Sequence, residues 1–245
     1  MGKIIAVVSG KGGTGKTTTV GALASCLAAL GHRTLCIDCD VGLRNLDITL
    51  GMSDFSVMDF SDVLNGYLTL DEACSEHPVI KGLFFLAAPA GGSLSNADGG
   101  ICPLLDEVRE NFDYCFIDAP AGVGAGFRFA AEGADMAIIV TTGDISSMRD
   151  GQRVAEELDK LGVPDMRLIV NRVARRNFRR TGMTVDGIID VVGAKLIGLI
   201  YEDDAVGLAA NREKALVLYN NKRAALQFLR TAQRIRGEEI PISIR

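Results

Sequence analysis

Apolar runs of strand length recur along the chain and are separated by segments with helical periodicity. The runs are continuous rather than alternating, which is typical of strands covered on both faces. They occupy residues 4–8, 34–37, 83–87, 114–117, 136–140, 166–170 and 195–200. The helical patterns occupy residues 17–30, 101–110, 125–132, 146–161, 184–192, 204–211 and 221–236. This alternation predicts an α/β fold, with a mostly parallel twisted sheet and helices on both faces.

Length and composition narrow the class of protein. The chain has 245 residues, of which 48% are hydrophobic and 23% charged, and its net charge is −5. One large domain is expected over 1–245, with a C-terminal helix at 220–237 and a short tail at 238–245. The negative charge argues against nucleic-acid binding by bulk electrostatics but leaves a local basic patch open. Because no apolar run approaches the ~20 residues of a membrane span, a cytoplasmic protein is expected.

Six cysteines and two histidines could suggest metal or redox chemistry. Cys36 and Cys39 form a CxxC, a spacing that metal sites and redox-active sites use. It lies where a buried strand runs into a loop, and an extended strand places residues three apart on opposite faces. We therefore expect the cysteines to be small apolar residues of the core. His32 and His77 have no partner nearby in sequence and are expected at the surface.

A glycine-rich loop follows the first predicted strand and leads directly into a helix. From Gly10 to Thr17 it satisfies G-x-x-x-x-G-K-[ST] in the strand–loop–helix context that this motif requires. Glycines let backbone N–H groups turn toward a phosphate, and the helix start adds the positive end of its dipole. Lys16 offers a charge to the β- and γ-phosphates, and the Thr17 hydroxyl offers a ligand to Mg²⁺. The predicted nucleotide-binding residues are Gly10, Lys11, Gly12, Gly13, Thr14, Gly15, Lys16, Thr17 and Thr18.

Two of the predicted strands end in aspartates. One runs into Asp38-Cys39-Asp40, and the other ends at Asp118 and continues as Ala-Pro-Ala-Gly. Carboxylates just past strand ends, beside a triphosphate, can orient an attacking water or hold the water shell of a metal. Asp118 is predicted to be the carboxylate that contacts Mg²⁺, usually through water. Asp47, farther along, is expected to cap a helix or turn.

Lys11 stands at the start of the loop, where most phosphate loops have no lysine. The segment KGGTGKT resembles the deviant P-loop ATPases of the MinD/ParA class. The stretch IDCDVGLRNLDITLG at residues 37–51 resembles switch I of the branch of this class that places the division septum. The segment DAPAG at residues 118–122 is similar to its switch II. The resemblance runs from residue 3 to about 237.

The resemblance implies roles for individual residues. Lys11 reaches across a nucleotide-sandwich dimer to the partner subunit's phosphates, and with Lys16 and Asp40 it forms the predicted catalytic set. Asp40 positions the hydrolytic water with support from Asp38. The implied metal residues are Thr17, Asp118 and Asp38. Gly122 senses the γ-phosphate through its backbone, and Asn171, after a strand, contacts adenine, for which an amide is chemically suited. Tyr201 stands where the family has a proline, in a segment similar to I-G-x-I-P-E-D.

The resemblance also implies a function. It predicts an ATPase that uses ATP and Mg²⁺, dimerises when ATP is bound, and helps position the division septum. A division inhibitor and an ATPase-activating protein are the implied partners. No catalytic arginine lies in the motifs, so slow intrinsic turnover is expected. One alternative is a DNA-segregation ATPase that uses the arginine-rich segment 172–180, including Arg175, Arg176, Arg179 and Arg180. Another is a metal-centre maturation ATPase, for which Cys102 or Cys115 would have to serve.

The carboxyl end bears on membrane association. Septum-placing members finish with a basic amphipathic helix that inserts into the membrane, whereas the last nine residues here contain a proline and two acids and show no amphipathic turn. In segment 221–236, Phe228 and Leu229 share an apolar side opposite Arg230 and Arg234. Burying each of these two side chains contributes roughly 1.5–3 kcal/mol. We therefore expect this helix to dock on the sheet, and association with the inner face of the membrane stays open.

Overall fold

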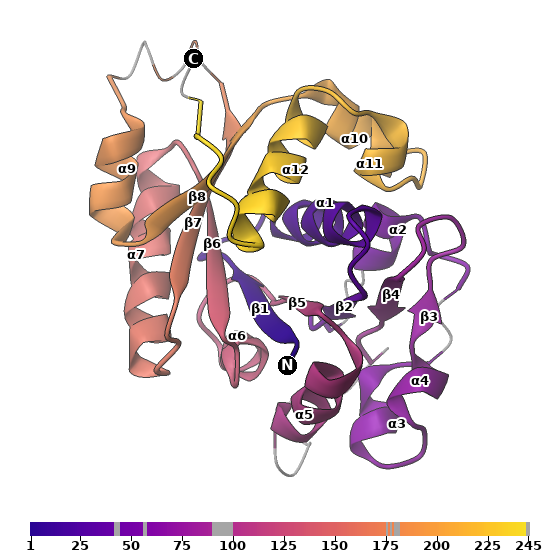
Figure 1. Ribbon diagram of the computed structural model, residues 1–245. Coiled ribbons are helices and arrows are strands. Elements are labelled where there is room, and N and C mark those ends of the chain that lie inside the picture. The colour runs from indigo at the N-terminus through magenta and orange to yellow at the C-terminus, as the bar shows by residue number, and fades with distance from the viewer. Residues whose placement is uncertain are drawn as a thin grey trace.

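A computed structural model describes residues 1–41, 45–55, 58–89, 100–174, 176, 178 and 182–243. Its strands form one sheet in the order β3-β4-β2-β5-β1-β6-β7-β8 (Figure 1). All neighbouring strands are parallel except β3, which is antiparallel to β4. The strands are β1 (Lys3–Val8), β2 (Thr34–Asp38), β3 (Ser75–Glu76), β4 (Leu83–Leu86), β5 (Tyr114–Asp118), β6 (Met136–Thr142), β7 (Met166–Val173) and β8 (Lys195–Tyr201).

Helices cover both faces of this sheet (Figure 1). One face carries α1 (Lys16–Ala29), α2 (Leu46–Leu50), α10 (Asp204–Ala210), α11 (Leu216–Tyr219) and α12 (Ala224–Ile235). The other face carries α3 (Phe60–Leu64), α4 (Leu70–Ala73), α5 (Cys102–Asn111), α6 (Ala125–Ala131), α7 (Ile145–Lys160) and α9 (Val185–Val192). The predicted fold class is confirmed.

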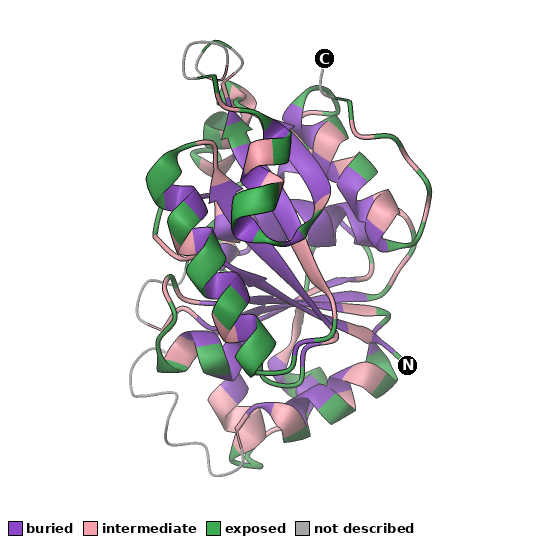
Figure 2. Ribbon diagram, turned by 90° about the vertical axis from the view of Figure 1, so that its left-hand side faces the viewer, coloured by how far each residue is buried: buried purple, intermediate pink, exposed green. Residues whose placement is uncertain are grey.

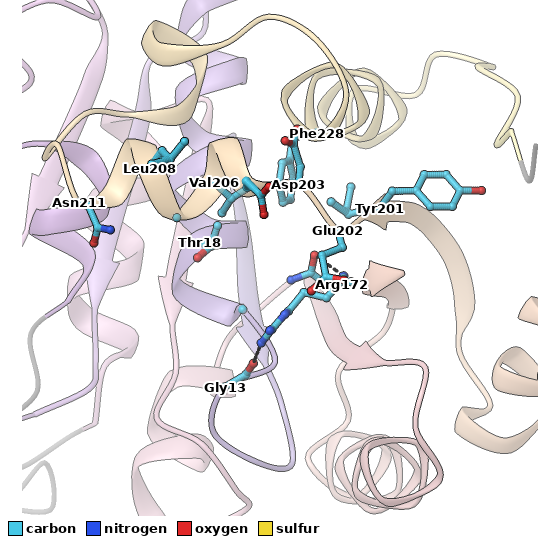
Figure 3. Close-up of a pocket in the computed structure, with 15 residues that line it drawn as sticks. Gly13, Thr18, Arg172, Tyr201, Glu202, Asp203, Val206, Leu208, Asn211 and Phe228 are labelled. Atoms are coloured by element: carbon cyan, nitrogen blue, oxygen red, sulfur yellow. Dashed lines mark hydrogen bonds between the residues drawn. The ribbon is translucent and has the colours of Figure 1, made fainter. Parts of the chain in front are cut away.

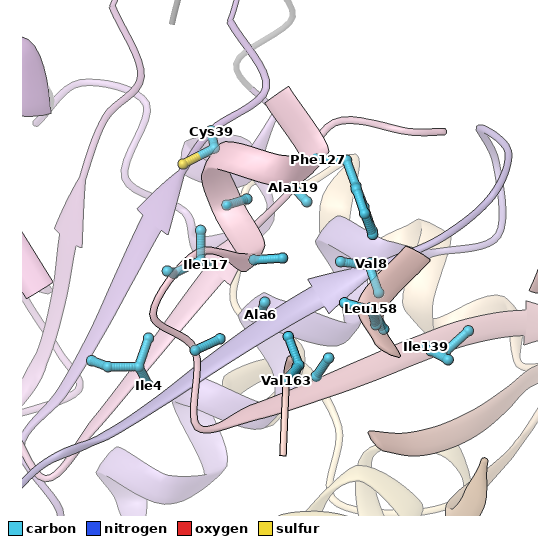
Figure 4. Close-up of a cluster of buried hydrophobic side chains, with 14 of the residues drawn as sticks. Ile4, Ala6, Val8, Cys39, Ile117, Ala119, Phe127, Ile139, Leu158 and Val163 are labelled. Carbon is cyan, nitrogen blue, oxygen red and sulfur yellow. The ribbon is translucent and has the colours of Figure 1, made fainter. Parts of the chain in front are cut away.

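The central strand β1 explains why its sequence is a continuous apolar run. Ile4, Ala6 and Val8 pack into the cluster on the α5–α7 side, while Ile5 and Val7 pack into the cluster under α1. Successive side chains of a strand point to opposite faces, so a strand covered on both sides needs apolar residues at every position. Figure 2 shows the buried sheet between its helical layers, and Figure 4 shows the cluster on the α5–α7 side.

The C-terminal helix docks on the sheet, which confirms the expected packing. In α12, Phe228 is 1% exposed and packs in the cluster beneath α1. Arg234, which the sequence places opposite the apolar side of this helix, makes contacts within the chain. Its guanidinium is partly buried and donates to the carbonyl oxygens of Ile197 at 3.0 Å, Ile240 at 2.7 Å and Pro241 at 3.0 Å. Arg234 therefore fastens the tail to β8, because three carbonyls replace the water that the guanidinium loses.

The expected surface position of His77 is also wrong. His77 is 5% exposed, and its Nδ1 accepts hydrogen bonds from the backbone N–H groups of Val79 and Ile80, both at 3.0 Å. Its Nε2 lies 3.0 Å from the Leu50 carbonyl oxygen. Burial lowers the pKa of His77, so the neutral ring serves as a structural bridge between α2 and the turn before β4. His32 is half-buried and lies edge-on to Tyr114.

Candidate nucleotide site

The candidate site lies at the carboxyl ends of the central strands. The loop Ser9–Gly15 joins β1 to α1, and the pairing register sets Asp38 of β2 beside Asp118 of β5 and Asp118 beside Val7 of β1. Residues in register on neighbouring parallel strands point to the same face, about 4.8 Å apart. The sheet therefore brings the two predicted carboxylates together beside the phosphate loop.

Each glycine of the loop has its own steric surroundings. Gly15 caps α1 in the left-handed region with φ 91°, and a Cβ there would lie 2.2 Å from Asn171 Nδ2. A Cβ on Gly10 would lie 2.6 Å from the backbone oxygen of Asp150 in α7, so only glycine allows this close approach. A Cβ on Gly12 or Gly13 would meet nothing within 4 Å. That side of the loop is open, as a phosphate cradle requires.

Lys16 and Asp118 form the buried charged pair of the site. Lys16 is 7% exposed and Asp118 1%, and Lys16 Nζ lies 3.5 Å from Asp118 Oδ1. Burial raises the pKa of Asp118, against the opposing effects of the Lys16 charge and the Thr17 side chain. Thr17 stands half-buried in the first turn of α1. The structure thus brings together a cation, a carboxylate and a hydroxyl at one end of the loop.

Asp38 is the second buried carboxylate. Its Oδ1 accepts a hydrogen bond from the Asp40 N–H at 2.8 Å, which also sets the half-buried Asp40 next to it. Burial, followed by the charge of Asp118, raises the pKa of Asp38 to about 7. A carboxyl group that resists ionisation when no ligand is present is suited to a position beside a cation.

Unpartnered oxygen atoms gather at this point. In the described part of the chain, Asp38 Oδ2, Asp118 Oδ2 and Thr14 Oγ1 are buried and have no hydrogen-bond partner. Mg²⁺ prefers one or two carboxylates together with hydroxyl, phosphate and water oxygens, rather than a cage made only of protein. Accordingly, no group of three His, Cys, Asp or Glu side chains that could hold a metal occurs among the described residues. The donor set of Asp38, Asp118 and Thr17 fits Mg²⁺ bound together with a nucleotide.

Lys11 lies outside this buried group. Its Nζ is 3.0 Å from Asp144 Oδ1 and 3.4 Å from Ser146 Oγ, at the start of α7. Asp144 caps α7 by accepting from the Ser147 N–H at 3.0 Å. Although burial raises the pKa of Asp144, hydrogen bonds from Thr142, Ser147 and Lys11 outweigh this effect and lower it. Within one chain, Lys11 is thus paired with its own α7, and the predicted contact across a dimer stays a prediction.

A cavity of about 650 Å³ lies between the phosphate loop and the segment after β8 (Figure 3). Asn171 lines it, but its Nδ2 donates to the Thr14 carbonyl at 2.9 Å and its Oδ1 accepts from the Arg172 N–H at 2.9 Å. Asn171 therefore buttresses the loop, and a second amide hydrogen is left for a base. The other lining residues include Gly13, Gly15, Thr18, Tyr201, Glu202, Asp203, Val206, Leu208, Asn211 and Phe228.

Tyr201 and Gly122 use their backbone N–H groups within the chain. The Tyr201 N–H donates to Gln227 Oε1 at 2.8 Å, a bond that a proline could not make, and its ring points away from the cavity in Figure 3. Gly122 has φ 90°, and its N–H donates to the Ser9 carbonyl at 2.9 Å. Its predicted role as a γ-phosphate sensor requires this N–H to leave the Ser9 carbonyl and donate to the phosphate instead.

Two polar residues of the site were missed by the sequence analysis. Asp203 Oδ1 accepts from the Ala205 N–H at 3.1 Å and its Oδ2 from the Ala224 N–H at 3.2 Å, so it ties α10 to α12 at the cavity. Asp144 likewise caps α7. Both aspartates directly precede a helical pattern, which is the usual signal of an N-cap.

The residues behind the alternative functions differ in burial: Cys102 is half-buried, and Arg176 is exposed. Cys36, Cys39 and Cys115 are fully buried, and burial raises the pKa of each thiol. The predicted core role of these cysteines is confirmed, and it argues against Cys115 as a cluster ligand. Arg175, Arg179 and Arg180 lie outside the described residues. In the same segment Phe178 is half-buried and packs over Gly143.

Comparison with known proteins identifies the family. A family model described as the CobQ/CobB/MinD/ParA nucleotide binding domain matches residues 5–217. The septum site-determining protein MinD of Bacillus subtilis is 36% identical over 249 residues, which cover 100% of this chain and 92% of that protein. The chain belongs to the MinD/ParA family. The predicted P-loop ATPase class and the assignment to division-site placement are thereby confirmed.

Two solved structures of MinD/ParA family members resemble this chain throughout. The MinC:MinD cell division protein complex of Aquifex aeolicus superposes with a TM-score of 0.90 at 34% identity and covers 98% of each chain. The MinD of Pyrococcus horikoshii complexed with Mg-ADP superposes with a TM-score of 0.85 at 29% identity and covers 96% of each chain. Membership of this nucleotide-binding family agrees with the open loop and the unpartnered oxygens described above.

Proposed function

We propose that this chain is a Mg²⁺-dependent ATPase that acts as an ATP-driven dimerisation switch in division-site placement. One observation carries the proposal: Asp38 and Asp118 are buried neighbours that each have an unpartnered oxygen, and Asp118 lies 3.5 Å from Lys16 at an open phosphate loop. Without a ligand, this arrangement costs free energy, because burial disfavours two ionised carboxylates. A Mg²⁺ ion would supply the positive charge that the two carboxylates lack, and a triphosphate would supply an anionic partner for Lys16.

The proposed chemistry assigns a task to each group. Lys16 neutralises the β- and γ-phosphates, while Thr17, Asp118 and Asp38 hold the metal and its water shell. Mg²⁺, when bound, neutralises charge that develops on the phosphate oxygens. Asp40 lies half-buried next to Asp38 and orients the attacking water.

Lys11 is the proposed sensor of the second subunit. Its pair with Asp144 is partly exposed, at 35% and 51% for the two side chains. Such a surface ion pair contributes about 0–1 kcal/mol. A partner subunit's triphosphate carries a larger negative charge, so exchange of Asp144 for that phosphate is favourable. ATP then joins two copies, and hydrolysis removes the group that joins them.

The partners are proposed by analogy. The Aquifex relative assembles with MinC, and we infer that this chain likewise engages a division inhibitor and an ATPase-activating protein. The start of α7 offers a surface for them, because Ile145 is 63% exposed and Arg149 lies exposed one turn later.

We also propose a cytoplasmic location for this chain. In the portion that the structure describes, no helix combines the length and apolar character that a membrane crossing demands.

The test measures Mg²⁺-dependent ATPase activity and molar mass by light scattering, with Mg-ADP and with a non-hydrolysable ATP analogue. The unmodified chain is expected to dimerise only with the analogue. Lys11→Ala is expected to bind nucleotide and remain a monomer, while Lys160→Ala, which removes an exposed lysine of α7, is expected to behave as the unmodified chain. A monomer in every nucleotide state overturns the switch, and ATP-dependent, salt-sensitive DNA binding favours the segregation alternative.

A further inference from the structure

Arg172 has an unusual backbone conformation for a residue at the end of a strand. Its φ is 53°, and among the described residues only Glu213 and Arg223 are further non-glycine residues with positive φ. The left-handed region is sterically disfavoured for a side chain with a Cβ. Such a conformation persists where the surrounding structure enforces it, and it often marks a functional site.

The surroundings of Arg172 show what this conformation achieves. The preceding Asn171 is fixed to the phosphate loop, and the turn at Arg172 directs the guanidinium back to the same loop (Figure 3). One of its terminal nitrogens donates to the Gly13 carbonyl at 3.3 Å. The side chain thus lies across the loop at the point where the 650 Å³ cavity meets the glycines.

Arg172 also borders a second cavity. This cavity has a volume of about 390 Å³ and is lined by Lys11, Thr14 and Asp144, among others. Gly13, Arg172 and Glu202 line both cavities. A nucleotide with its base in the larger cavity and its phosphates in the loop therefore spans this junction.

The guanidinium is largely free to bind an anion. It has five N–H donors, and among the described residues its one hydrogen-bond acceptor is the neutral Gly13 carbonyl. Within the described residues no carboxylate oxygen lies within 4.0 Å of it, and the side chain is exposed. An arginine fork matches phosphate oxygens and binds them more strongly than a neutral donor does.

We propose that Arg172 is a further nucleotide-binding residue that contacts the phosphate chain of a nucleotide whose base occupies the 650 Å³ cavity. The inference rests on the proposed function, since it requires that the loop binds a nucleotide. The left-handed backbone conformation directs the side chain to the loop. Its unfavourable free energy is therefore offset when the side chain contacts a ligand.

The test exploits this conflict between backbone and side chain. Arg172→Gly relieves the backbone and removes the contact, Arg172→Lys keeps a cation, and Arg223→Gly is the matched control. Arg223 is also exposed, has φ 47° and lines neither cavity. For the unmodified chain and each variant we would measure the melting temperature without nucleotide. Calorimetry would then give the affinity for Mg-ADP and for adenosine.

We expect Arg172→Gly to melt at the same temperature as the unmodified chain or higher, yet to bind Mg-ADP about tenfold more weakly. Adenosine, which has no phosphate, should bind both equally, Arg172→Lys should recover part of the Mg-ADP affinity, and Arg223→Gly should bind normally. Equal Mg-ADP affinity for Arg172→Gly and the unmodified chain overturns the inference alone. Equal weakening of adenosine and Mg-ADP also overturns it, in favour of a structural role. Failure of the unmodified chain to bind Mg-ADP overturns the proposed function and the inference together.

Discussion

Replacing Asp38 by asparagine is expected to stabilise the nucleotide-free protein above neutral pH. The carboxyl of Asp38 is 1% exposed, lies beside Asp118 and has one oxygen without a partner. Its pKa rises from 3.8 to about 7 on folding. Between these values the folded state binds more protons than the unfolded state, so stability falls as the pH rises through this window and levels off above it.

The magnitude follows from the pKa values. Each pH unit between 3.8 and about 7 corresponds to about 1.4 kcal/mol, so the ionised carboxyl lowers the free energy of unfolding by about 4 kcal/mol above neutral pH. The asparagine amide keeps an acceptor for the Asp40 N–H, although its new N–H groups cost about 1–2 kcal/mol where they find no partner. The expected net gain is about 2–3 kcal/mol, or about 4–12 °C in Tm for a chain of this size.

The assay is urea unfolding of both proteins in EDTA, without nucleotide, at several values between about pH 4.5 and about pH 8. Asp38→Asn should show little of the decline that the unmodified chain shows over this range. Asp106→Asn, which removes an exposed carboxylate of α5, is the control and should leave the decline unchanged. With Mg-ATP the unmodified chain should be the more stable of the two, because the metal loses a ligand in Asp38→Asn. A variant that is less stable by the same amount at every pH would refute the argument that the buried charge is unfavourable.

Three further outcomes are expected. Gly10→Ala should lower stability by about 1–3 kcal/mol in thermal unfolding, because its Cβ meets the α7 backbone, whereas Gly12→Ala, with open space around it, should change Tm little. Phe228→Ala should lower the free energy of unfolding by about 3–5 kcal/mol in urea, whereas Leu226→Ala, at an exposed position, should lower it by under about 1 kcal/mol. Similar losses for both variants would contradict the packing of α12. Lys16→Ala should reduce Mg-ADP affinity more than 100-fold by calorimetry, and retained affinity would contradict its role.

The central architecture could be predicted because its causes are local. A strand such as β1 is covered on both faces, so its sequence is continuously apolar, and the phosphate loop is a motif in its required context. The short helices α2, α3, α4 and α11 were not predicted, because four or five residues are too few to establish a helical period. The signal that was available for α4 is its capping box, in which Thr69 and Glu72 exchange hydrogen bonds.

The contacts that define the candidate site join residues far apart in sequence. Asn171 bonds to Thr14 across 157 positions and Lys11 to Asp144 across 133. No periodicity or spacing encodes such pairs. Asn171 was predicted to contact adenine, which stays a prediction, and its two bonds to backbone groups could not be foreseen. His77 was misjudged for the same reason, since its backbone partners include Leu50, 27 residues away.

Several departures from ordinary folding rules lie at the phosphate loop. Of the six buried side-chain atoms without a partner in the described chain, three belong to Thr14, Asp38 and Asp118. The left-handed Arg172 lies at the same loop. The other three atoms belong to Ser25, His32 and Ser53 and are scattered along the described chain, whereas those of Thr14, Asp38 and Asp118 belong to the candidate site. Each departure at the loop is unfavourable in the free chain and, in the proposed function, would be relieved by a bound cation or phosphate. Stability and Mg-nucleotide binding are therefore expected to be linked. Features of this loop that lower the stability of the free chain would strengthen binding, because the ligand relieves them.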